Sequence, residues 1–321
     1  MDRQKSGKIL SDFILEGKRP RNQVATLSGL TNTYIRNLEN GEIKNVPKKR
    51  LIALGVALNL DFSELETLLQ AFDRAALTEE DIPVFIETAE KAKFSEAVLP
   101  VRDLSTYELI LLSLERAPGR QVIVNDRPTS SLMVEGHRTH TDRAILSRHA
   151  IYQKLNEAIG TARRDNFIKL VNTCPVDHYI CKSCLENYLG KDQDRLERQY
   201  RYQHVLALLD MVKAHNNFNL YITDSCFNLF FTMKLTGKQG AQDILSYSSR
   251  APHTIERGIR GRIFGFITEN SAFCKCFEEE LKQISQTAMP FSSKEQQIQY
   301  LHSLLNPIAA EFGGKFEHGS H

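Results

Sequence analysis

The sequence lacks several features that would point to particular protein classes. No apolar stretch approaches the roughly 18–20 residues needed to cross a bilayer, and the first residues have neither the apolar core nor the cleavage site of a secretory signal. We therefore expect a cytoplasmic protein without a membrane partner. The six cysteines follow no regular framework, which favours reduced thiols over structural disulfides. Gly-x-Ser-x-Gly, Walker, dinucleotide-binding and His-Glu-x-x-His motifs are also absent, so we expect no enzyme.

Length and charge distribution give the first positive indications. A chain of 321 residues suits two or three domains, and 41% hydrophobic with 25% charged residues is typical of a folded globular protein. The net charge of +2 hides an asymmetry, because residues 1–50 hold 11 lysines and arginines against 5 acidic residues, whereas the remainder holds 30 against 34. A basic end on a mildly acidic chain is expected of a module that contacts phosphates.

The first 72 residues show the apolar spacing of short amphipathic helices. Gly29 is suited to end the second helix in a left-handed conformation, and Thr31 is a good N-cap for the third. Asn40-Gly41 can then close the third helix, because both residues tolerate a positive φ. Two short helices joined by a tight turn form the helix-turn-helix plan. The expected helices cover residues 7–16, 21–28, 32–39, 48–58 and 63–72.

A more specific pattern runs through residues 21–60. It combines a small residue in the second helix, a glycine in the turn, a β-branched residue in the third helix and a Glu-Asn-Gly close, at Ala25, Gly29, Ile35 and Glu39-Asn40-Gly41. Residues 7–69 thereby resemble the Cro and lambda-repressor-like (XRE) family. The resemblance implies a five-helix DNA-binding domain over residues 1–72. Pro20-Arg21 departs from the Ser-Gln that the family often has before the second helix, so we expect Arg21 to supply the phosphate contact there.

Helix geometry divides the third helix into a buried and an outer face. Apolar residues such as Val24, Ile35 and Leu38 are expected to lock the second helix onto the third. The outer face then presents side chains that can pair with adenine, with guanine or with a thymine methyl group: Asn32, Thr33, Arg36 and Asn37. Backbone phosphates, which set register without reading sequence, are expected beside Arg21, Asn40, Lys44 and Lys48.

Two questions about this domain stay open in the sequence. Tyr34 either stacks on a DNA sugar or packs against the first helix. The whole bundle either binds double-stranded DNA or serves only for contacts with other proteins.

The rest of the chain has mixed helical and strand character. We expect a helical linker over residues 73–103, a mixed α/β domain over residues 104–312 and a disordered tail over residues 313–321. The fold class is therefore α + α/β. The expected strands cover residues 121–125, 166–172, 218–223, 227–235, 243–249 and 262–268. The expected helices cover residues 106–116, 143–163, 181–189, 193–216, 271–287 and 293–312.

One segment gathers metal-ligating side chains, with three thiols and an imidazole within eleven residues: Cys174, His178, Cys181 and Cys184. Such a set can bind zinc or an iron–sulfur cluster, and Cys181-x-x-Cys184 at a helix start also suits a redox pair. Zinc sites usually combine two arms about a dozen or more residues apart. The second arm would have to come from Cys226 or from Cys274-Lys-Cys276, and ordinary thiols are the alternative.

Two further loops carry charge. His137-x-x-His140 lies in a polar loop where it can ligate a metal or line an anion pocket, or can be plain surface. Residues 248–262 contain several arginines that can clamp a phosphorylated effector, touch DNA or form a solvated turn.

The sequence thus predicts a bacterial-type transcription regulator. One helix-turn-helix unit reads only a short site, so useful specificity requires two copies on a two-fold operator and we expect a homodimer. The C-terminal domain is expected to dimerise and to sense a small-molecule or peptide effector. The alternatives are a metal or redox sensor that uses the Cys174–Cys184 cluster, and a DNA-targeted enzyme.

Overall fold

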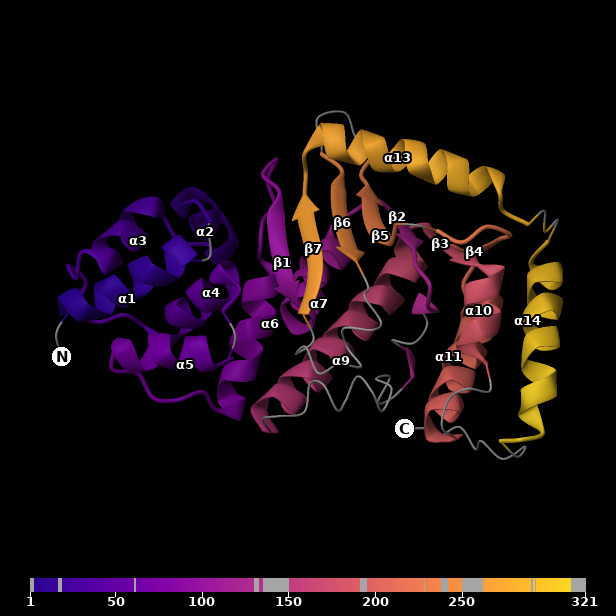
Figure 1. Ribbon diagram of the computed structural model, residues 1–321, viewed down its shortest axis with the longest axis horizontal. Helices are drawn as coiled ribbons and strands as arrows, with labels where there is room; N and C mark the ends of the chain where they lie inside the picture. Colours follow the sequence, from indigo (N-terminus) through magenta and orange to yellow (C-terminus); the bar gives the residue numbers. More distant parts are fainter. Residues whose placement is uncertain are drawn as a thin grey trace.

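The computed structural model describes residues 3–16, 19–60, 62–129, 133–134, 150–190, 195–227, 229–237, 242–249, 262–289, 291 and 293–312. The predicted tail at 313–321, the loop with His137 and His140, and residues 250–261 of the basic loop lie outside these ranges. The described residues form an elongated molecule, with the N-terminal helices at one end and α14 (Lys294–Ala309) at the other (Figure 1).

Short helices joined by tight turns make up the N-terminal domain. Gly29 ends the second helix with a φ of 68°, a conformation that glycine adopts without steric cost. The Thr31 hydroxyl accepts a hydrogen bond from the Tyr34 N–H at 3.1 Å and caps the third. The bounds are α1 (Arg3–Glu16), α2 (Arg21–Ser28), α3 (Asn32–Glu39), α4 (Lys48–Leu58) and α5 (Phe62–Ala71). The predicted ranges of α2, α3 and α4 are confirmed, whereas α1 begins earlier than predicted.

The segment after α5 is packed between the two ends of the molecule. It contains η1 (Glu79–Asp81), α6 (Ile82–Glu90), β1 (Leu99–Asp103) and α7 (Leu104–Arg116). The linker predicted over residues 73–103 contains α6, and it also contains β1, a strand that was not predicted and that pairs with another strand of the sheet. Phe85, Phe94 and Leu99 share one hydrophobic core with residues of α1–α5, α7 and α9 (Ala150–Thr173). The core of the N-terminal domain is therefore continuous with that of the sheet domain.

In the part of the chain that the structure describes, the C-terminal domain is built on a mixed seven-stranded sheet in the order β1-β7-β6-β5-β2-β3-β4. Strands β2, β3 and β4 run parallel to one another, and all other neighbours pair antiparallel. The strands after β1 are β2 (Arg120–Val124), β3 (Val176–Cys181), β4 (Phe218–Thr223), β5 (Phe231–Leu235), β6 (Ile244–Ser249) and β7 (Arg262–Thr268). The mixed sheet with its helices confirms the predicted combination of a helical N-terminal domain and an α/β C-terminal domain.

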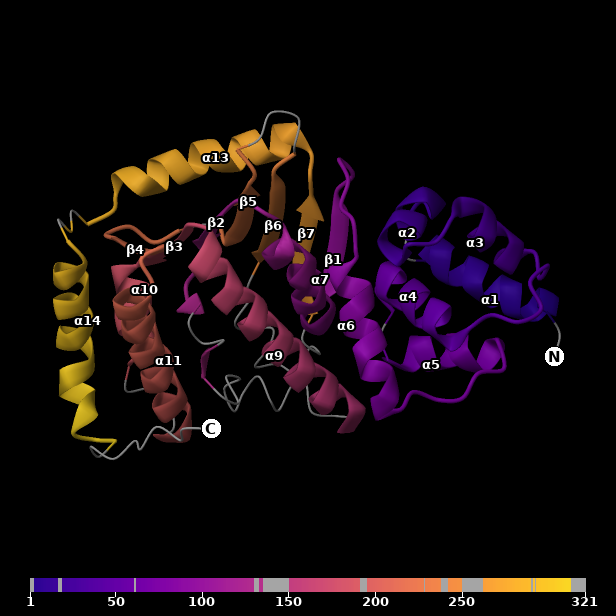
Figure 2. The same cartoon turned by 180° about the vertical axis from the view of Figure 1, so that it is seen from behind.

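Helices cover both faces of this sheet. On one face, α13 (Ser271–Gln286) buries Leu281 and Ile284 against Val122 and Met233. On the opposite face, a second core includes residues of α9, α10 (Lys182–Tyr188), α11 (Arg195–Ala214) and α14. Figures 1 and 2 show α13 lying along the sheet at the top of the molecule, with α9 crossing below it.

The second half of α9 corrects a sequence prediction. Residues 166–172 were expected to form a strand, but they continue a single helix from Ala150 to Thr173. Phe167, Leu170 and Val171 are buried at the spacing of one helical face, continuing from Ile159. The predicted start of this helix, near residue 143, lies outside the described residues.

Strand β3 was not predicted. All six of its residues are buried, because strands in the parallel part of a sheet are covered on both faces. Asp177 and His178 interrupt the apolar run that normally marks such a strand.

Among the described residues, no helix combines the length and the apolar character needed to cross a membrane.

Candidate functional site

The outer face of α3 is a polar surface at the far end of the molecule. Asn32, Thr33 and Arg36 are exposed and Asn37 is half-buried, whereas Ile35 on the inner face is fully buried. The two opposite views place α3 farther from the sheet than α2 and α4 (Figures 1 and 2). The side chains predicted to contact bases therefore share one accessible helix surface.

Contacts at its C-terminal end hold α3 in place. The Arg21 guanidinium donates from Nε to Glu39 Oε2 at 2.6 Å and from Nη2 to Oε1 at 3.1 Å, and this hydrogen bond raises the pKa of Arg21. Gly7 of α1 lies so close to α3 that a Cβ atom added there would be 2.0 Å from the Glu39 carbonyl oxygen. Arg21, predicted to contact phosphate, thus also joins the start of α2 to the end of α3.

The other predicted phosphate contacts divide into two groups. Asn40 and Lys44 are exposed, and the Asn40 amide donates to Glu42 at 3.1 Å. Lys48 instead donates its ammonium to the Ala76 carbonyl oxygen at 2.7 Å and to Asp81 at 2.6 Å. The Lys48 side chain is 23% exposed, and these two contacts join the start of α4 to the segment that contains η1.

Tyr34 belongs to the packing of the domain. Its ring lies partly buried against the hydrophobic core, and the Arg50 guanidinium covers it at 4.5 Å from the ring centroid. This cation–π contact joins α3 to α4.

The described geometry agrees with a comparison of the sequence with known families. Residues 13–65 match the helix-turn-helix family model. The N-terminal domain is a helix-turn-helix domain of the XRE type. Domains of this kind bind duplex DNA with their second motif helix in the major groove, and α3 holds that position here. No curated protein and no solved structure matches the chain.

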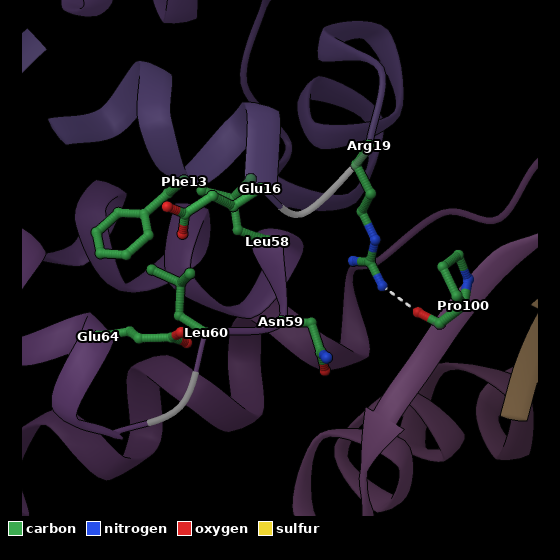
Figure 3. Close-up of a pocket in the computed structure, with 8 residues that line it drawn as sticks. All are labelled: Phe13, Glu16, Arg19, Leu58, Asn59, Leu60, Glu64 and Pro100. Carbon is green, nitrogen blue, oxygen red and sulfur yellow. Dashed lines mark hydrogen bonds between the residues drawn. The ribbon is translucent and has the colours of Figure 1, made fainter. Parts of the chain in front are cut away.

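The helix-turn-helix domain meets the sheet domain through a buried arginine. Arg19 is 4% exposed and donates hydrogen bonds to the carbonyl oxygens of Ala57 in α4 and Pro100 in β1. A pocket of about 130 Å³ opens beside this contact (Figure 3). Its lining consists of Phe13, Glu16, Arg19, Leu58, Asn59, Leu60, Glu64 and Pro100.

In the C-terminal domain, three sulfur atoms converge, but not the predicted set. Cys181 Sγ lies 3.0 Å from Cys226 Sγ, and Cys184 Sγ lies 3.8 Å from the same atom. The three sulfur atoms are all within 4.8 Å of one another. Burial raises the pKa of Cys181 and of Cys184.

Cys174 and His178 are not part of this group, which corrects the predicted ligand set. Cys174 precedes β3, whereas Cys181 is the last residue of that strand. His178 is fully buried, with its ring 6.3 Å from that of Phe218, and burial lowers its pKa to about 3. The four residues were predicted to form one site because β3 was not recognised in the sequence. An extended strand in fact separates Cys174 from Cys181 and Cys184.

Cys226 was predicted from the sequence only as one of two possible second arms of a metal site. It follows β4 by three residues, and β4 pairs in parallel with β3 so that Thr223 lies opposite Cys181. Parallel neighbours end at the same edge of a sheet. If strands had been predicted at both 176–181 and 218–223 and paired in parallel, Cys226 would have been expected beside Cys181 and Cys184.

A second polar cluster lies between the sheet and the helices below it. Gln121 and Lys234 are directly opposite in the β2–β5 ladder and are buried. Neither the Lys234 ammonium nor the Gln121 amide oxygen has a hydrogen-bond partner among the described residues. Burial lowers the pKa of Lys234 to about 8. The negative charge of nearby Glu115 acts in the opposite direction and raises this pKa, but its effect is smaller. Unsatisfied buried polar atoms of this kind mark positions for water or a polar ligand.

Proposed function

We propose that this protein is a sequence-specific, DNA-binding transcription regulator that reads duplex DNA with the outer face of α3. The observation that carries the proposal is the division of α3 into a fixed inner face and an exposed polar face. Arginine pairs bidentately with guanine and asparagine with adenine in the major groove. The exposed side chains of Arg36 and Asn32 are of these two kinds.

The experiment starts from full-length protein and a pool of random duplex DNA, from which the preferred site is selected. Arg36→Ala should lose about 1–3 kcal/mol of affinity for that site and lose its preference at one base pair. Lys282→Ala is the matched control, because it removes the same charge from an exposed position on α13, at the other end of the chain.

Two results contradict the proposal. One is failure of the selection to enrich any sequence, and the other is equal loss of affinity in Arg36→Ala and Lys282→Ala. Equal loss would mean that net charge, and not the face of α3, determines binding.

We further propose that the protein acts as a homodimer on a two-fold site. A single helix-turn-helix unit contacts too few base pairs for the specificity ratio that a genome demands. Light scattering on the free protein and on its complex with the selected site should give two chains per particle. A monomer on a single half-site would contradict this part of the proposal.

The C-terminal domain is proposed to receive the signal, as a binding domain and not as a catalyst. An effector that places a carbonyl or carboxylate oxygen near Lys234 would satisfy its buried ammonium, which offsets the cost of burying that charge. We expect a small polar or anionic molecule to co-purify or to be recovered by mass spectrometry of the intact complex. Lys234→Met should abolish its retention, and Lys213→Met on the exposed surface of α11 should not.

A further inference from the structure

Three thiols meet at the edge of the sheet where β3 and β4 end. Cys181 is the last residue of β3 and the N-cap of α10, and Cys184 lies in the first turn of that helix. Cys226 comes from the turn after β4. None of the three is in a disulfide. The carboxyl ends of neighbouring parallel strands are where α/β sheets generally place ligand sites.

The distances between these sulfur atoms suit a single bound cation. Two thiolates on one tetrahedral zinc ion, with bonds of about 2.3 Å, lie about 3.8 Å apart. The separation of Cys184 Sγ and Cys226 Sγ is 3.8 Å, and Cys181 Sγ at 3.0 Å from Cys226 Sγ needs only a small outward movement. The Cys184 N–H also donates to Cys181 Sγ at 3.1 Å, and such an outer hydrogen bond orients a metal-binding sulfur.

We propose that Cys181, Cys184 and Cys226 bind one thiophilic cation, zinc or monovalent copper, as three thiolates. Three sulfur ligands select soft or borderline metals over magnesium and calcium, which take oxygen ligands. Iron–sulfur clusters are most often held by four cysteine thiolates, and no fourth cysteine among the described residues joins the group. Cys226 is exposed, so the site opens to solvent and leaves a coordination position for water or an exogenous ligand. The metal site does not depend on the DNA-binding proposal.

The test uses reduced, chelator-stripped full-length protein and adds one metal at a time under anaerobic conditions. Cobalt is the spectroscopic probe for the zinc position, and one equivalent should give a thiolate charge-transfer band that zinc then removes. A competition with a chromophoric copper(I) chelator forms the second arm and decides which cation binds more tightly. Mass spectrometry of the intact protein should show one ion per chain.

Serine variants locate the site. Cys226→Ser and Cys184→Ser should each weaken binding by more than about 100-fold, since even outer partners of metal ligands are worth about 10- to 100-fold. Cys174→Ser tests the set predicted from the linear sequence and should bind like the wild type, as should Cys276→Ser on the surface of α13.

Thiol alkylation of the wild-type protein provides a check that needs no variant. One equivalent of the bound ion should protect Cys184 and Cys226 from a maleimide while Cys276 reacts at an unchanged rate. The proposal is wrong if no metal binds, if Cys226→Ser binds as tightly as the wild type, or if the protein isolated in reductant carries a Cys181–Cys226 disulfide.

Discussion

His178 carries a pH dependence that its position in β3 dictates. The unfolded chain takes up a proton at this histidine near pH 6.5, whereas burial lowers the folded pKa to about 3. Between these values the unfolded state binds more protons, so stability is complete above pH 6.5 and falls as the pH is lowered. We expect this residue alone to cost about 1 kcal/mol of unfolding free energy between pH 7 and pH 5.5.

Urea unfolding of the wild type and of His178→Leu at the two pH values measures this contribution. The variant should lose that part of the pH dependence, whatever its stability at pH 7. His302→Leu is the control, because His302 is exposed on α14. An unchanged pH dependence in His178→Leu would show that the folded protein accommodates the protonated imidazole.

The sequence allowed the individual residues of α3 to be placed but not those of the thiol group. Each α3 position follows from one helical period and two local capping signals, at Gly29 and Thr31. The thiol group instead depends on the pairing of two strands, β3 and β4, that are distant in sequence. The ion pair of Lys48 was not predictable for a similar reason, since its partner Asp81 lies 33 positions farther along the chain.

At the scale of elements, the crossing of α1 over α3 depends on one glycine. A Cβ atom at position 7 would lie 2.0 Å from the Glu39 carbonyl oxygen, so Gly7→Ala must push the two helices apart. Overpacking of this kind typically costs about 1–3 kcal/mol. We expect Gly7→Ala to lower the melting temperature. We also expect it to weaken DNA binding, because α3 shifts. Lys8→Ala, exposed on the same helix, should leave the melting temperature nearly unchanged, and equal behaviour of the two variants would contradict the close crossing.

The packing of α9 against α7 contains a buried ion pair. Arg163 donates from Nη2 to Glu115 Oε1 at 2.6 Å and from Nε to the same oxygen at 2.9 Å, and burial raises the pKa of Glu115. Removal of one partner of such a pair leaves an uncompensated charge and costs about 3–5 kcal/mol. We expect Arg163→Met to lose that much stability in urea unfolding.

The double variant Arg163→Met, Glu115→Leu should recover part of the loss, because the carboxylate that Arg163 compensates is removed as well. The recovery is incomplete because the buried Lys234 ammonium then loses the nearby negative charge of Glu115. If the single and double variants unfold at the same urea concentration, Glu115 left without Arg163 is not the cause of the lost stability.

Elements with a strong local period were predictable, and elements defined by the sheet were less so. Strand β4 and helix α11 follow from their own sequences. The end of α9 was misread because NFIKLVN contains branched apolar residues that suit a strand, while its burial has the period of a helix. Strand β1 went unpredicted because only its pairing with β7 at the sheet edge stabilises Leu99–Asp103 as a strand.

At the scale of the whole molecule, the two domains share a core and should unfold together. Leu10 and Ile35 of the helix-turn-helix domain belong to the same buried cluster as Phe85, Leu112 and Ile159. We expect calorimetry of the full chain to give one transition, with a calorimetric enthalpy equal to the van't Hoff enthalpy. Two resolved transitions would show that the junction does not couple the domains.

Arg19 tests that junction directly. Arg19→Met leaves the Ala57 and Pro100 carbonyl oxygens without their charged donor, and loss of a hydrogen bond to a charged group costs about 1.5–3 kcal/mol. We expect the variant to broaden or split the calorimetric transition. Arg36→Met, which removes an equal charge from the exposed face of α3, should keep a single sharp transition.

The continuous core also constrains the operator itself. A regulator whose DNA-binding domains are flexibly tethered tolerates half-sites at several separations. Here the shared core fixes the orientation of α3 relative to the sheet domain. In the proposed dimer, the two α3 helices would therefore meet DNA at one fixed spacing and one fixed helical phase, near a full turn of about 10–10.5 base pairs or a multiple of it. Insertion of a single base pair between the half-sites rotates one of them by about 34°. Such an operator should lose most of its affinity, and a further ten inserted base pairs should not restore it.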